Sequence, residues 1–216
     1  NEVKIVKEKN GQPVDSKPLK PGKRGLVMVK GRQVMKGYYK RPDLTAKIID
    51  KDGWLNTGDL GMISCDKELK IVGRAKDTIV LLGGENIERV VIENAVNASP
   101  LVERCVVLGQ DQKYIAALIC PDQANVIAYA EENSIFYDNY ENLLETNEIQ
   151  NVFRTEIDMR VNAKTGFRTC ERIFKFGLLH QSFQLGKEIN AKHELMRHSI
   201  SEIYKKEIKK LFSEKK

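Results

Sequence analysis

Two short motifs carry the side chains of this 216-residue chain that are best suited to chemistry. The first, Gly-Trp-Leu-Asn-Thr-Gly-Asp, occupies residues 53–59 and ends on Asp59. The second, Gly-Arg-Ala-Lys-Asp, occupies residues 73–77 and contributes Arg74. A carboxylate only accepts hydrogen bonds and therefore suits a diol, whereas a guanidinium offers a rigid fork of donors. These motifs are the first candidates for a ligand site.

The residues around the first motif read as strands and turns. Across residues 1–72, short alternating or apolar runs are separated by turns rich in Gly, Pro and Asn. Residues 62–64 and 69–72 flank the polar run 66–68, which is a hairpin signal. The pattern predicts a small antiparallel β-barrel or distorted sheet.

From Gly73 onward the pattern changes to alternating strands and helices. A Gly-Gly turn at Gly83 and Gly84 follows a short apolar strand and is expected to open a helix at Asn86. The helix is predicted to present Val91, Ile92, Ala95 and Val96 on one face. Further strands are expected at 102–108, 114–120 and 173–179, and further helices at 122–133, 139–164 and from about 194. The whole chain is therefore predicted to be α+β, with a β-rich part followed by an α/β part whose mixed sheet is flanked by helices.

The composition is that of an ordinary globular protein. Apolar residues make up 41 % and charged residues 31 %, and no run approaches the roughly 20 apolar residues of a membrane span. The net charge is +6. Residues 1–72 carry 16 positive and 9 negative side chains, and the remainder carries 20 positive and 21 negative side chains. The lysines of the basic part show no helical stripe or interleaved aromatics, so no nucleic-acid partner is predicted. Four scattered cysteines show no metal spacing and favour free thiols in a cytoplasmic protein.

In this order and spacing, the motifs resemble those of the adenylate-forming (AMP-binding) enzymes, the acyl-CoA synthetases and their relatives. Residues 35–42 are similar to the Gly-Tyr-x-x-x-Pro element of that family. The resemblance implies that residues 1–75 are the β-rich end of the large N-terminal domain and that 76–216 are the mobile C-terminal lid. Residues 165–173 and the helical insertion before them resemble the long-chain fatty acid branch.

The resemblance also implies roles for individual residues. Asp59 would accept hydrogen bonds from the ribose of ATP, and Arg74 would support the same nucleotide. Lys76 would be the hinge at which the lid turns, and Gly83 and Gly84 would line the tunnel for the pantetheine arm of coenzyme A.

Each of these residues also has a plainer interpretation. Asp59 could cap the turn before it, and Arg74 could form a surface ion pair with Asp77. The two glycines could simply form a strand-to-helix turn.

The family's catalytic lysine has no direct match. It neutralises charge between the carboxylate and the α-phosphate during adenylation. A gapless register anchored on Arg197 places Glu194 at its position. A two-residue shift of the loop would let Lys192 supply the charge, and Lys187 is a second candidate. The third alternative is that the chain has no catalytic lysine.

The family's phosphate loop has no match in this sequence either. The resemblance therefore implies the C-terminal part of a long-chain fatty acyl-CoA synthetase that needs the rest of its N-terminal domain for activity. Its substrates would be a fatty acid, ATP and coenzyme A, with Mg²⁺ as the cofactor of the whole enzyme. An acyl carrier protein synthetase and a non-catalytic homologue are the alternatives. A cytoplasmic location is expected, and peripheral membrane contact is left open.

Overall fold

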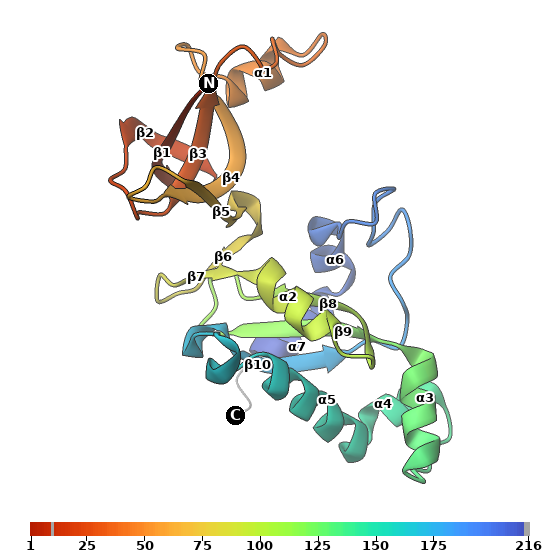
Figure 1. Ribbon diagram of the computed structural model, residues 1–216. Helices are drawn as coiled ribbons and strands as arrows, with labels where there is room; N and C mark the ends of the chain where they lie inside the picture. The colour runs from red at the N-terminus through yellow and green to blue at the C-terminus, as the bar shows by residue number, and fades with distance from the viewer. Residues whose placement is uncertain (10, 214–216) are drawn as a thin grey trace. The chain divides into compact units, whose positions relative to one another are not determined.

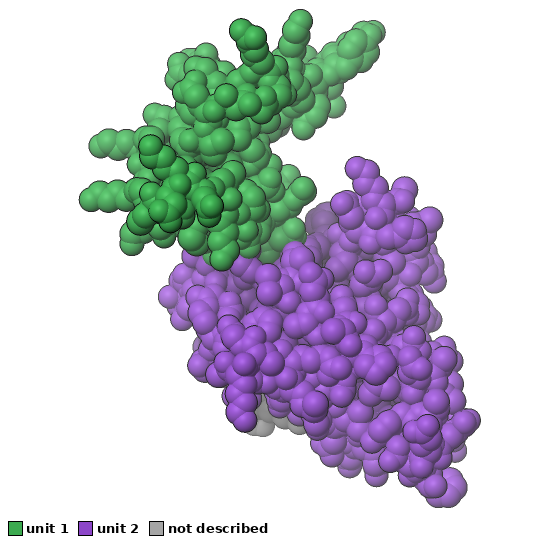
Figure 2. All heavy atoms as spheres, in the orientation of Figure 1, with its two compact units in different colours: residues 1–78 green, residues 79–216 purple. Residues whose placement is uncertain are grey.

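A computed structural model describes residues 1–9 and 11–213 of the chain. The chain divides into two compact units, Asn1–Thr78 and Ile79–Lys216, which are drawn in different colours in Figure 2. The division falls inside the short strand β6 (Thr78–Val80). Each unit has its own hydrophobic core and is described by itself.

Unit 1 is built on a five-stranded antiparallel sheet with the strand order β2-β1-β3-β4-β5 (Figure 1). Its elements are β1 (Glu2–Lys9), β2 (Gln12–Pro18), β3 (Gly25–Lys30), α1 (Pro42–Ile48), β4 (Leu55–Ile63), β5 (Leu69–Arg74) and the 3-10 turn η1 (Ala75–Asp77). Val6, Leu26 and Met28 form the centre of its core, and Trp54 packs against them. The predicted hairpin is confirmed as β4 and β5, which are joined by a turn in which Lys67 has a φ of 64°. The β-rich part is therefore a sheet.

Unit 2 contains a three-stranded mixed sheet with the order β10-β9-β8, in which β10 runs parallel and β8 antiparallel to β9 (Figure 1). A separate two-stranded ladder joins β6 and β7. The elements after β6 are β7 (Asn86–Glu88), α2 (Arg89–Asn97), β8 (Val102–Leu108), β9 (Ile115–Pro121), α3 (Gln123–Glu132), α4 (Tyr140–Glu145), α5 (Asn147–Arg160), η2 (Ala163–Thr165), η3 (Thr169–Glu171), β10 (Ile173–Leu178), α6 (Arg197–Ile203) and α7 (Lys205–Phe212). The predicted α+β class with a mixed sheet and flanking helices is confirmed at this level.

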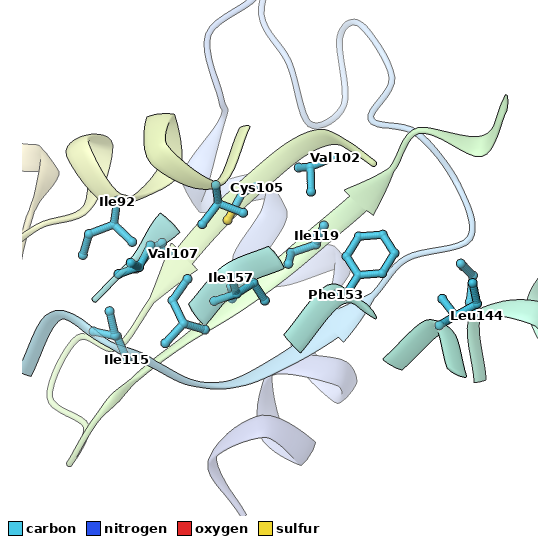
Figure 3. Packing of buried hydrophobic residues seen from close by; sticks show 14 of the residues in the cluster. Ile92, Val102, Cys105, Val107, Ile115, Ile119, Leu144, Phe153 and Ile157 are labelled. Carbon is cyan, nitrogen blue, oxygen red and sulfur yellow. The ribbon is translucent and has the colours of Figure 1, made fainter. Parts of the chain in front are cut away.

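The central strand β9 is buried on both faces. Ile115, Ala117 and Ile119 face the core formed with α2 and α5, where Phe153 is fully buried (Figure 3). Their alternate neighbours face a second core formed with α6 and α7. Burying a large aliphatic or aromatic side chain stabilises a fold by about 1.5–3 kcal/mol. The sheet therefore provides a rigid support for loops on either side of it.

The start of α2 differs from the prediction. Residues Asn86–Glu88 pair with β6 as strand β7, and the helix begins only at Arg89. Ile87 is fully buried in this strand conformation, which explains why the chain stays extended there. Within the helix, Val91 is 52 % exposed, and Glu93 takes the buried position beside Ile92. The buried face of α2 is therefore rotated from the predicted one and includes a charged side chain.

The C-terminal helix also differs from the prediction. It is divided into α6 and α7 at Tyr204, whose φ and ψ of −97° and 27° leave the helical region. Ile200 and Leu211 are buried as expected, whereas Ile203 is 50 % exposed. Across residues 1–9 and 11–213, no helix is long and apolar enough to cross a membrane.

The environments of the cysteines predict a strong contrast in reactivity. Cys65 is exposed in the β4–β5 turn, whereas Cys105 and Cys120 are buried free thiols. Burial raises the pKa of Cys105 well above its ordinary value and that of Cys120 to about 12. Because the thiolate is the reactive species, these raised pKa values leave almost no nucleophile at pH 8.

Alkylation at pH 8, followed by mass spectrometry, should therefore modify Cys65 rapidly and leave Cys105 and Cys120 unmodified until the protein is unfolded. The fast modification at position 65 should be absent in Cys65→Ser, whereas the half-buried Cys170 should react equally in both proteins. Rapid alkylation of Cys105 in the folded protein would contradict the packing described here.

Candidate functional site

Asp59 and Arg74 lie opposite each other on neighbouring strands of the sheet in unit 1. They are paired residues of the antiparallel strands β4 and β5. The Arg74 Nε lies 3.3 Å from the Asp59 Oδ1, and the two side chains are 31 % (Asp59) and 73 % (Arg74) exposed. An exposed ion pair of this kind contributes only about 0–1 kcal/mol to stability. Both groups can therefore exchange this contact for a ligand at little cost to the fold.

The backbone before Asp59 is fixed by its neighbours. The Thr57 hydroxyl accepts a hydrogen bond from the Asp59 N–H at 3.0 Å and donates one to the Val27 carbonyl at 2.9 Å. The Asn56 side chain accepts from the Gly58 N–H at 2.9 Å, and Gly58 has a φ of 74° that only glycine adopts easily. These contacts fix an irregularity inside strand β4, where the register against β3 shifts between residues 56 and 60, and the Asp59 carboxylate contacts Arg74.

A hollow of about 440 Å³ lies beside this pair within unit 1. Its lining includes Met35, Tyr38 and Leu55 as apolar groups, the backbone turn at Gly58, and Arg74 with Lys76 as cations. Lys76 is exposed within η1, two residues before the end of unit 1. The lining combines cations with an apolar wall, which suits a small anionic molecule, and Asp59 is linked to the hollow through its contact with Arg74 and does not line it.

In unit 2, Gly83 and Gly84 form the turn between β6 and β7. The Gly84 N–H donates to the Leu81 carbonyl at 2.9 Å, and the Leu81 N–H donates to the Glu85 carbonyl at 3.0 Å. Gly84 has a φ of 84° with open space where a side chain would be, whereas a side chain at Gly83 would meet the Glu85 carboxylate. The turn is thus exposed, tightly closed and free of side-chain bulk at its tip.

This turn adjoins a hollow of about 690 Å³ in unit 2. Its lining includes Leu81 and Glu85 from the turn. It also includes two cations, Lys113 and Arg172, and the exposed aromatic ring of Phe174. A second hollow of about 890 Å³ continues along α5 toward η2. Arg154 and Asp158 line both hollows, so the two form a continuous groove of mixed charge.

The lysine candidates lie on a hairpin between β10 and α6. Bridges join Leu185 to Ile189 and Ile189 to Leu195, and the tip between them carries Lys192 and Glu194. Lys192 is exposed near the apex, and Lys187 is exposed at the opposite bend. The Glu194 carboxylate accepts a hydrogen bond from the Asn190 Nδ2 at 3.0 Å.

Sequence reasoning missed two buried carboxylates beside this hairpin. Glu93 forms a two-pronged ion pair with Arg197, with N–O distances of 2.7 and 2.8 Å. Glu188 accepts hydrogen bonds from the Gln184 N–H at 2.9 Å and from the Tyr204 hydroxyl at 3.3 Å. Glu93 lies outside the predicted apolar face of α2, so no local pattern indicated that its carboxylate would be buried.

Comparison with known families matches residues 76–216 to the AMP-binding enzyme C-terminal domain. The match covers well over half of the chain. The chain belongs to this family of adenylate-forming enzymes. The resemblance seen in the sequence is confirmed.

Curated relatives of this chain include acyl-activating ligases. A chloroplastic long-chain-fatty-acid–[acyl-carrier-protein] ligase of Arabidopsis thaliana is 42 % identical over 132 residues, which cover 56 % of this chain and 18 % of the ligase. A long-chain-fatty-acid–CoA ligase of Cavia porcellus is 32 % identical over 162 residues, which cover 74 % of this chain and 23 % of the ligase. The chain therefore spans about a fifth of the length of these relatives.

A solved structure supports the fold. The adenylation domain of a carboxylate reductase from Mycobacterium chelonae matches 99 % of this chain and 31 % of its own length, with a TM-score of 0.79 and 23 % identity. The AMP-binding family thus accounts for the architecture of the chain. Across residues 1–9 and 11–213, no group of three or more His, Cys, Asp or Glu side chains is placed to hold a metal ion.

Proposed function

We propose that this chain is the C-terminal part of an ATP-dependent fatty acyl-CoA synthetase. The whole enzyme would join a fatty acid to ATP, giving acyl-AMP and pyrophosphate, and coenzyme A would then displace AMP to give acyl-CoA. The observation that carries the proposal is the Asp59–Arg74 ion pair, whose arginine lines a hollow in unit 1. The similarity to a long-chain-fatty-acid–CoA ligase over 74 % of the chain supports the acyl class.

In this proposal unit 1 binds the nucleotide. The Asp59 carboxylate accepts hydrogen bonds from both ribose hydroxyls, because it has only acceptor sites and its backbone is fixed within strand β4. Arg74 exchanges its contact with Asp59 for the nucleotide and adds positive charge where the phosphates leave. The phosphate loop itself would come from the rest of the N-terminal domain.

The lid of the enzyme would be residues 76–216, and residues 1–75 would complete the N-terminal domain. Lys76 is proposed as the hinge, because a lid that turns needs a short exposed segment that absorbs the backbone change. Its place in η1, close to the boundary between Thr78 and Ile79, supports this role.

The thiol acceptor would approach along the Gly83–Gly84 turn. A tip without side chains permits a slim pantetheine arm to pass close to the backbone. The adjoining groove offers Lys113 and Arg172 for phosphates and the 66 % exposed Phe174 for a base. These features favour coenzyme A as the acceptor.

An acyl carrier protein is the second candidate acceptor. The observation that favours it is the 42 % identity to an acyl-carrier-protein ligase, which exceeds the 32 % identity to the Cavia porcellus CoA ligase. The carrier's phosphopantetheine arm would use the same Gly83–Gly84 turn, so the two acceptors differ in whether the groove binds a nucleotide.

The full-length enzyme that contains this chain should release pyrophosphate from ATP with a panel of fatty acids. Each acid should then be tested with coenzyme A and with phosphopantetheinylated carrier protein. Product with coenzyme A alone supports the proposal, and product with the carrier alone supports the second candidate. If no acid gives pyrophosphate, a non-catalytic homologue becomes the better description.

A further inference from the structure

The tip of the hairpin between β10 and α6 is organised by one side chain, Asn190. Its Oδ1 accepts hydrogen bonds from the backbone N–H of Lys192 at 2.8 Å and of Glu194 at 3.0 Å. Its Nδ2 donates to the Glu194 carboxylate at 3.0 Å, and its carbonyl accepts from the His193 N–H at 2.9 Å. The Glu194 carboxylate is therefore drawn back onto its own turn.

The base of the hairpin is fixed by Glu188, which is only 5 % exposed. Its carboxylate binds the Gln184 N–H and the Tyr204 hydroxyl, and its carbonyl accepts from the Met196 N–H at 2.7 Å. Burial, with Glu188 beside it, raises the pKa of Tyr204, so this hydroxyl keeps its proton and remains a donor. A buried carboxylate with these partners joins both arms of the hairpin to the junction of α6 and α7.

A second buried carboxylate, Glu93, fixes the point where the hairpin enters α6. Glu93 is 4 % exposed. Its carboxylate accepts hydrogen bonds from the Val107 N–H at 2.9 Å and from both terminal nitrogens of the Arg197 guanidinium. Two-pronged charged contacts restrict both the distance and the orientation of the partner. The end of the hairpin is thereby joined to α2 and β8, on the rigid core of unit 2.

We infer that Glu194 is a turn-forming residue held by Asn190, and that Glu93, Glu188, Arg197 and Tyr204 are positioning residues that fix the hairpin so that its apex presents Lys192. The inference rests on the proposed function for the role of Lys192, but not for the rigidity of the hairpin. It explains how a carboxylate can occupy the position of the family's lysine in a gapless register. The carboxylate completes the turn, and the cation stands two residues earlier.

Amide hydrogen exchange tests the hairpin without any activity. In Asn190→Ala, the N–H groups of Lys192 and Glu194 lose their acceptor and should exchange about fivefold to tenfold faster, as expected for loss of one capping side chain. Asn139→Ala is the matched control, because Asn139 caps α4 through the same kind of contact with the Asn142 N–H. It should leave exchange at residues 190–194 unchanged. Unchanged exchange in Asn190→Ala would overturn the inference.

The positioning role is tested by separating the two half-reactions of the full-length enzyme. Arg197→Lys keeps the charge but loses the two-pronged contact, and Tyr204→Phe removes only the hydroxyl, so both variants should fold. Each should slow pyrophosphate release about tenfold while thioester formation from supplied acyl-AMP stays unchanged. An equal loss in both half-reactions would show that these residues only stabilise the fold, and it would overturn the positioning role. If the wild type releases no pyrophosphate, the proposed function fails, whereas the exchange result still decides the hairpin.

Discussion

Replacement of Lys192 by alanine in the full-length enzyme is expected to lower the rate of pyrophosphate release by about 10²–10³. Removing one fixed group that stabilises charge in a transition state typically costs about 2.7–4 kcal/mol. Lys192 lies near the apex of the hairpin between β10 and α6 and is exposed, so the substitution leaves the buried contacts of Glu93 and Glu188 intact. The measurement is the rate of pyrophosphate release at saturating ATP and fatty acid.

Lys187→Ala is the matched control, because Lys187 is another exposed lysine of the same hairpin. It should keep the wild-type rate. A second variant decides the register: Glu194→Lys placed in the Lys192→Ala background should not restore activity, since the new side chain also loses its contact with Asn190. Recovery in that double variant would show that the gapless register is right and that Lys192 is not the cation.

Those parts of the fold that depend on neighbouring residues could be predicted from the sequence. The β4–β5 hairpin was visible because the polar run 66–68 separates two apolar segments, and the strand pairing that it implies brings Asp59 opposite Arg74. Strand β9 was readable as a buried strand because each of its residues is apolar, and it has a covered sheet face on both sides. In both cases the signal and the structure lie within a few residues of each other.

The parts that sequence reasoning missed depend on contacts between distant residues. Glu93 and Arg197 are separated by 104 positions, so no local pattern indicates their ion pair. The same contact accounts for the buried charge on α2, whose buried face contains Ile92, Glu93 and Val96 and leaves Val91 exposed. Likewise, Ile87 stays in a strand because it packs into the core of unit 2, and its helical pattern is overridden.

In the candidate site, too, local motifs could be recognised in the sequence, whereas contacts that depend on the folded structure could not. The motifs located Asp59, Arg74 and the Gly83–Gly84 turn, since each lies in a short segment whose residue types are restrictive. They could not show what the Glu194 carboxylate binds, because that depends on how the hairpin closes around Asn190. The sequence alone favoured Lys192, with Lys187 and the absence of a catalytic lysine as the alternatives, and the assignment of Lys192 stays a prediction.

Replacement of Asp59 by alanine is expected to weaken ATP binding to the full-length enzyme by roughly 100-fold. Two hydrogen bonds from ribose hydroxyls to a charged acceptor are worth about 1.5–3 kcal/mol each, and water recovers part of this when the carboxylate is removed. The fold should remain intact, because Thr57 and Asn56 fix the backbone of strand β4 before Asp59 and the ion pair with Arg74 contributes little. The measurement is the KM for ATP in pyrophosphate release, together with AMP binding by calorimetry.

Asp59→Asn refines the test, because it keeps one acceptor oxygen but removes the charge, and it should fall between the wild type and Asp59→Ala. Asp66→Ala is the matched control, since Asp66 is an exposed aspartate in the turn of the same β4–β5 hairpin. It should bind AMP as the wild type does. If Asp59→Ala binds AMP normally while Arg74→Ala does not, the nucleotide is held by the cation alone. The carboxylate would then serve only to orient Arg74 across the β4–β5 pair.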